Sequence, residues 1–232
     1  MTEVGEPATE RYERDGFSVV EALVGPALVD RLRDVCAEMT APLRDRAGDE
    51  RYSITMPGSL AEPAVADLVA TVAASAVDLL GGQVEPTFVL MHAVTCTLAD
   101  GRGWHQALVY HRLPYSPDGT SVPLDEIEYL IMLDDAYDDD MAAWFAPGYH
   151  VAPMLEHRRH EIGGHSGFEL IEPQRQLVLP ETVKVPLRSG DAVGYTLGTP
   201  HACICARDET PRREVLFMRL GFRERSTRPP TA

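Results

Sequence analysis

The sequence predicts an α+β protein that is mainly β, with helices first and strands after. Two helix-like stretches, 26–39 and 61–80, lie in the first part of the chain. Beyond Gly82 the apolar segments become short and β-branched, and Gly, Pro and Asp separate them. Many short strands with turn residues between them are typical of a sandwich or barrel. Helices followed by strands indicate an α+β architecture.

The first predicted elements come before Gly82. Residues 11–23 indicate a short helix, a glycine turn and a strand. In 26–39 the apolar residues recur at spacings of three and four, with charged residues opposite, which predicts an amphipathic helix. Residues 41–58 are polar and have no clear period, so a loop is expected there. The Ala/Val/Leu face of 61–80 predicts a second helix, which a pair of glycines ends.

The later segments predict strands with turns between them. These strands are expected at 86–98, 107–112, 126–134, 142–146, 169–172, 176–179, 183–187, 192–197 and 213–222. The aspartates of 134–140 are interpreted as a solvated turn between two strands. We expect one domain over 1–225 and a disordered tail over 226–232.

Composition excludes several classes of partner. The 232 residues carry a net charge of 21 − 36 = −15, which argues against nucleic-acid polymers and against anionic membranes as partners. The four cysteines are too scattered for a disulfide framework, and a zinc site at Cys203 and Cys205 would need two more ligands. No signal peptide is expected, because the opening MTEVGE has neither a basic nor an apolar region, and no membrane span is expected, because no run approaches roughly 18 apolar residues. We therefore expect a cytoplasmic monomer or weak homodimer.

Two of the eight histidines have informative neighbours. His105 lies in the segment 103–107, GWHQA, just before an apolar stretch. His201 follows the segment 190–200, GDAVGYTLGTP, and precedes the segment 210–213, TPRR. A histidine count alone says little, because most histidines are structural or solvated, so the neighbours of these two carry the information.

Together these segments resemble the phytanoyl-CoA dioxygenase family of iron(II)- and 2-oxoglutarate-dependent oxygenases. The resemblance runs from Tyr12 to about Phe222. It rests on five pieces in order: the opening YxxDGFxVV at 12–20, WHQ at 104–106 against the family's Trp-His-Gln-Asp motif, LDD at 133–135 followed by FAPGYH at 145–150, GD at 190–191 before His201, and Arg212 eleven residues after His201. It implies a double-stranded β-helix (a cupin-like jelly roll) with N-terminal helices packed on one sheet.

The resemblance also implies roles for individual residues. His105 and His201 are expected to bind iron, and Arg212 to bind the distal carboxylate of 2-oxoglutarate through its guanidinium fork. Arg213, its neighbour on the opposite strand face, is the alternative for that role. Two histidines on a metal leave positions open for the keto acid and O2.

One residue departs from the family pattern in a way that changes the expected chemistry. The family's iron-binding carboxylate should stand at 107, where this chain has Ala107, and a methyl group cannot bind a metal. His-x-Ala in place of His-x-Asp resembles the halogenase branch of these enzymes, in which chloride takes the vacated position. Two alternatives stay open: an oxygenase with an atypical ligand set, and a metal-free binding protein on the same fold.

The substrate is less well determined by the sequence. A compact chain has little room for a carrier-protein docking insertion, which favours a freestanding small molecule. The tract 157–160, HRRH, followed by a glycine-containing stretch, could hold the phosphate of a nucleotide through Arg158 and Arg159, or it could be a solvated basic loop. Tyr110 and Trp144 could stack on a substrate or pack in the core.

Overall fold

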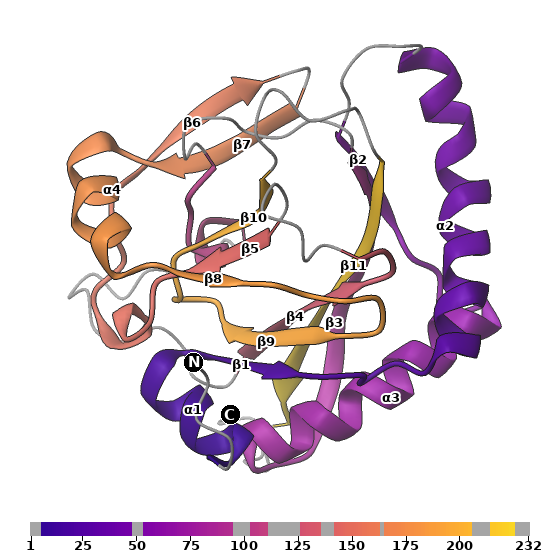
Figure 1. Ribbon diagram of the computed structural model, residues 1–232, viewed down its shortest axis with the longest axis horizontal. Helices are drawn as coiled ribbons and strands as arrows, with labels where there is room; N and C mark the ends of the chain where they lie inside the picture. Colours follow the sequence, from indigo (N-terminus) through magenta and orange to yellow (C-terminus); the bar gives the residue numbers. More distant parts are fainter. Residues whose placement is uncertain are drawn as a thin grey trace, which may run out of the picture.

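Two antiparallel sheets face each other, with helices outside the larger one (Figure 1). The computed structural model describes residues 6–47, 53–94, 103–110, 126–135, 142–162, 165–205 and 214–225. Its strands are β1 (Phe17–Val20), β2 (Ser53–Pro57), β3 (Val84–Val94), β4 (Glu126–Met132), β5 (Ala142–Phe145), β6 (His157–Ile162), β7 (His165–Leu170), β8 (Val183–Val185), β9 (Ala192–Thr196), β10 (His201–Cys205) and β11 (Val215–Glu224). Its helices are α1 (Ala8–Asp15), α2 (Pro26–Ala47), α3 (Pro63–Leu80) and α4 (Glu172–Val178), with 3-10 turns η2 (Ala107–Tyr110), η3 (Tyr149–Val151) and η4 (Leu179–Glu181).

The strand order is that of a jelly roll closed around an interior. The larger sheet runs β1-β9-β4-β11-β3-β2, the smaller one runs β10-β5-β8, and β6 and β7 form a separate hairpin. Strands β1 and β2 lie between the first three helices, and most of the antiparallel strands follow α3, so the expected α+β, mainly β fold is confirmed. The expected tail, 226–232, lies outside the described residues.

The central strand β4 separates two apolar clusters. Every residue of β4 is buried. Ile127 and Ile131 face the cluster that α2 and α3 cover, whereas Leu130 and Met132 face the cluster between the two sheets. Because successive strand residues point to opposite faces, the even-numbered residues of β4 line the interior. The helices therefore pack on one sheet, as expected.

Helix α3 is the one described helix that is long and apolar enough to cross a membrane by length and composition. Its packing explains the apolar composition, because one face is buried against the larger sheet. The buried residues of that face are Ala64, Val65, Leu68, Val72, Ala76 and Leu79. Burial of such a face within the protein is typical of a core helix.

The expected loop 41–58 is wrong at both ends. Helix α2 continues through Pro42 to Ala47, and β2 occupies 53–57 at the edge of the larger sheet. Proline removes one helical hydrogen bond and disfavours a helix interior. Tertiary contacts offset this cost, since Leu43 packs on the core and Arg44 forms an ion pair with Glu214 at 2.5 Å.

Three expectations about the later segments are also wrong. Residues 107–110 form a 3-10 turn where 107–112 was expected to be a strand, and 176–179 lies in α4 and η4. The basic tract at 157–160 belongs to strand β6 and is not a loop. Short apolar runs do not by themselves distinguish strands from turns or helices, and proline near the start of both α4 and η4 favours the helical conformation there.

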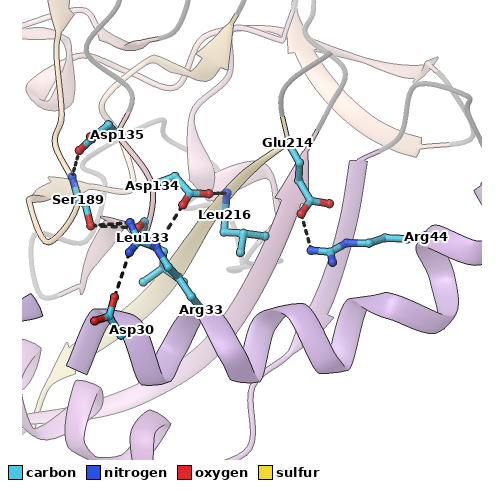
Figure 2. A network of polar contacts seen from close by, with 9 residues as sticks. All are labelled: Asp30, Arg33, Arg44, Leu133, Asp134, Asp135, Ser189, Glu214 and Leu216. Atoms are coloured by element: carbon cyan, nitrogen blue, oxygen red, sulfur yellow. Dashed lines mark hydrogen bonds and ion pairs between the residues drawn. The ribbon is translucent and has the colours of Figure 1, made fainter. Parts of the chain in front are cut away.

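The first two aspartates after β4, Asp134 and Asp135, form a structural junction and not a solvated turn (Figure 2). The carboxylate of Asp134 accepts hydrogen bonds from the backbone N–H of Leu216, at 2.8 Å, and from Arg33 of α2, at 3.2 Å. Asp135 accepts the backbone N–H of Ser189 at 2.9 Å. These bonds tie α2 and the turn before β9 to the start of β11. The later aspartates of the run lie outside the described residues.

Candidate metal centre

His105 and His201 lie side by side on paired backbone segments. The N–H of each donates to the carbonyl of the other, at 3.0 Å for His105 and 2.9 Å for His201, in a bridge outside the named strand ladders. Their ring centroids are 4.4 Å apart. His201 is the first residue of β10, and its pairing with Phe145 of β5 fixes its place in the smaller sheet. The two histidines that the sequence predicts as a pair therefore meet in space.

Both imidazoles are held in the same tautomer. Nδ1 of His105 lies 2.7 Å from the carbonyl of Gly103, and Nδ1 of His201 lies 2.9 Å from the carbonyl of Thr199. A carbonyl only accepts, so each Nδ1 carries the proton and each Nε2 carries the lone pair. Second hydrogen bonds of this kind orient metal-binding histidines. Nε2 of His201 is buried and has no hydrogen-bond partner in the described part of the chain.

Burial keeps His201 neutral. The side chain is fully buried, and desolvation lowers its pKa well below the usual value; the nearby charge of His105 acts in the same direction. Neutral imidazole is the form that binds metals. A buried nitrogen that is neither protonated nor hydrogen-bonded is costly in the absence of a ligand, so this atom fits a metal ion.

Ala107 follows His105 by two residues and lies in a small apolar cluster. It is fully buried and shares the cluster with Leu108 and Leu197. Among the described residues, no set of three or more His, Cys, Asp or Glu side chains is placed to hold a metal. Within that part of the chain, no other carboxylate replaces the missing ligand. The donor set is thus two imidazoles, which fits iron(II) when the remaining positions are taken by small ligands and a keto acid.

Aromatic side chains enclose His201 on the inner side. Its ring lies 4.6 Å from that of Tyr195 and 5.8 Å from that of Phe145, measured between centroids. Trp144 points the other way, because it neighbours Phe145 on β5, and it packs on the cluster around Trp104. The proposed stacking residue Trp144 therefore does not join the aromatic group that contacts His201.

The two arginines expected to bind 2-oxoglutarate come shortly before β11 in the sequence. Arg212 and Arg213 lie outside the described residues, as does the side chain of Tyr110. Within them, the inner face of β11 carries Arg219, which forms an ion pair with the fully buried Glu128 of β4. Sequence analysis did not single out this pair, because a charge in a strand gives no sign of which face it occupies.

The basic tract does not form a common phosphate fork. Arg158 and Arg159 are successive residues of β6, so their side chains point to opposite faces of the hairpin. Arg158 is ion-paired with Glu169 on β7 at 2.6 Å. Both arginines are exposed. The tract therefore gives no support to a nucleotide as the substrate.

Sequence reasoning also missed Gln106, which lies between His105 and Ala107. Its side chain is fully buried and joins two distant segments. Nε2 donates to the carbonyl of Gly198 at 2.7 Å, and Oε1 accepts the backbone N–H of Leu155 at 2.8 Å. Its place in a Trp-His-Gln segment could have indicated a supporting role, but its partners are not apparent from the sequence.

A family model supplies the deciding comparison. The model described as phytanoyl-CoA dioxygenase (PhyH) matches residues 12–203 of this chain. The chain belongs to the phytanoyl-CoA dioxygenase family. The match covers both histidines, and the expected resemblance is thereby confirmed at the level of the family. No curated protein matches the chain significantly.

Solved structures agree with this assignment at the level of the fold. The epimerase SnoN, in complex with Fe3+, alpha ketoglutarate and nogalamycin RO, is 18% identical, with 94% of this chain and 82% of that chain covered and a TM-score of 0.65. EvdO2 from Micromonospora carbonacea var. aurantiaca is 19% identical, with 99% and 98% covered and a TM-score of 0.65. HygX from Streptomyces hygroscopicus, with nickel and 2-oxoglutarate bound, is 16% identical, with 94% and 86% covered and a TM-score of 0.65. This PhyH-family chain thus has the fold of iron- and 2-oxoglutarate-dependent enzymes.

Proposed function

We propose that this PhyH-family protein is an iron(II)- and 2-oxoglutarate-dependent halogenase. The observation that carries the proposal is Ala107, a buried methyl group two residues after His105, in a pair of histidines whose Nδ1 atoms are both held by backbone carbonyls. An anionic side chain is missing next to a cation, and chloride is a small anion that suits such a position. The relatives' fold supports the iron and the keto acid, and Ala107 supports the halide.

The chain's own residues would do the following. His105 and His201 would bind iron through Nε2, because their Nδ1 atoms donate to carbonyls. The cluster of Ala107, Leu108 and Leu197 would border the chloride and exclude water from it. Arg212 is the candidate for the acid end of 2-oxoglutarate, with Arg213 as the alternative.

The overall reaction balances with these components. A C–H bond, chloride, O2, 2-oxoglutarate and one proton would give a C–Cl bond, succinate, CO2 and water. When bound, the iron supplies the oxidising power with O2 and the keto acid. The substrate is proposed to be a freestanding small molecule in natural-product biosynthesis, since SnoN is an epimerase from nogalamycin biosynthesis.

One buried atom argues against the alternative function, a metal-free binding protein. Nε2 of His201 is buried without a hydrogen-bond partner among the described residues, which a protein that binds nothing there would be expected to avoid. An oxygenase with an atypical ligand set would need a further ligand from outside the described residues.

Anaerobic spectroscopy tests the proposal. Iron(II) and 2-oxoglutarate added together should give a metal-to-ligand charge-transfer band in the visible range, and chloride should shift that band. A band that chloride leaves unchanged would favour the oxygenase. Absence of any band at saturating iron would favour the metal-free protein.

A further inference from the structure

The segment that carries His105 is held by the β6–β7 hairpin. The N–H of Gln106 donates to Nε2 of His157, the first residue of β6, at 3.1 Å. The carbonyl of Trp104 accepts the N–H of Leu170, the last residue of β7, at 2.7 Å. Both strands of the hairpin therefore bond to residues directly beside His105.

The hydrogen bond to His157 needs one tautomer, and the structure provides it. Nδ1 of His157 lies 2.7 Å from the carbonyl of Leu155 and must donate to it, since a carbonyl only accepts. Nε2 is then the acceptor for Gln106. Desolvation lowers the pKa of His157, which keeps the ring in the neutral form that can accept.

The side chain of Gln106 adds two hydrogen bonds to the connection between the hairpin and the His105 segment. Its Oε1 accepts the N–H of Leu155, and its Nε2 donates to Gly198, three residues before His201. One residue thus joins the entry to β6, the His105 segment and the turn before His201. A shift of β6 would move both histidines.

We propose that His157 is a positioning residue for the metal centre, which holds the backbone between His105 and Ala107 by accepting the amide proton of Gln106. The inference rests on the proposed function, because it assigns a purpose to the segment that binds iron. A metal site needs its ligands held within about 0.5 Å, and the His105 segment lies outside the named strand ladders. The hairpin supplies the support that a neighbouring strand would otherwise give.

Two variants of His157 separate this role from general packing. His157→Gln places an amide oxygen where Nε2 lies, so it keeps an acceptor for Gln106. His157→Met has a similar size and no comparable acceptor. Arg158→Met is the matched control, because it removes the cross-strand ion pair with Glu169 and leaves the bond to Gln106 intact.

Amide hydrogen exchange of Gln106 in the metal-free protein is the first measurement. Exchange should be at least about tenfold faster in His157→Met than in the wild type, and close to wild type in His157→Gln and Arg158→Met. Equal exchange in the wild type and His157→Met would overturn the inference. This measurement needs no metal, so it decides about the hydrogen bond even if the proposed function fails.

Anaerobic iron(II) affinity is the second measurement. Loss of a supporting hydrogen bond typically weakens metal binding by about 10- to 100-fold, which is the range expected for His157→Met. His157→Gln should restore most of the affinity. If the wild type binds iron and His157→Met binds it within twofold, the positioning role is wrong. If the wild type itself binds no iron, the proposed function is wrong.

Discussion

His105 and His201 form two backbone hydrogen bonds with each other, and the centroids of their imidazole rings are 4.4 Å apart. Pairing of this kind fixes the two Cα atoms relative to one another before any ligand binds. The distance between the imidazoles is therefore a property of the fold. Because the fold fixes the pair in this way, substitutions around it are expected to have well-defined effects.

Restoring a carboxylate at Ala107 should abolish halogenation. In Ala107→Asp the new side chain would occupy the position that we assign to chloride, and some hydroxylated product could form in its place. Product masses from a panel of small molecules, with chloride present, are the measurement. Ala107→Gly is the control and should keep chlorination, since it leaves the space open. Undiminished chlorination in Ala107→Asp would mean that the halide lies elsewhere.

The assignment of Arg212 to the 2-oxoglutarate site can be tested against the alternative, Arg213. Arg212→Ala should raise the dissociation constant of 2-oxoglutarate more than Arg213→Ala, because a guanidinium fork binds a carboxylate through two hydrogen bonds. Titration of the charge-transfer band with 2-oxoglutarate gives both constants. The reverse order would assign the role to Arg213.

Loss of the interior ion pair between Glu128 and Arg219 should lower the free energy of unfolding far more than loss of a surface pair. Glu128 is fully buried, so Glu128→Gln removes a charged partner of Arg219 inside the protein. A loss of about 3 kcal/mol in the free energy of unfolding is expected. Asp67→Asn removes the exposed pair with Arg31 and should cost less than about 1 kcal/mol. Urea denaturation measures both, and equal small losses would contradict the burial argument.

Stability should fall as the pH falls below the usual histidine value of 6.5. Burial lowers the pKa of His150 and of His157, so the unfolded chain binds protons at a higher pH than the folded chain does. The unfolded state then binds more protons below pH 6.5, and stability decreases with falling pH. Free energies of unfolding between pH 8 and pH 5 give the slope.

His150→Gln isolates one contribution to that slope. Nε2 of His150 donates to the carbonyl of Glu13 at 3.1 Å, and a glutamine amide can donate to the same carbonyl without titrating. The variant should therefore lose stability less steeply on acidification than the wild type. An unchanged slope would show that His150 contributes little to the pH dependence.

Much of the fold could be predicted because its signals are local. The period of α2 and the glycine at the end of α3 are properties of neighbouring residues, and both helices form where expected. The errors arise where tertiary contacts override local preference. Pro42 does not end α2, because Leu43 and Arg44 find partners beyond it.

The residues of the site likewise divide into those with a local sequence signal and those that depend on tertiary contacts. His105 and His201 could be predicted from their flanking residues, and they meet as expected. Gln106 and His157 could not be paired from the sequence, because 51 positions separate them and a hydrogen bond to a backbone N–H leaves no pattern. The interior position of Arg219 likewise depends on the register of β11 against β4.

The bridge between His105 and His201 joins residues that are 201 − 105 = 96 positions apart. A metal ion held by both side chains would act as a reversible cross-link between the two halves of the chain. The metal would be held by both histidines only in the folded state, because closing so long a loop in the unfolded chain costs entropy. The melting temperature should therefore rise with metal concentration, and the folded protein should become harder to pull apart from its ends.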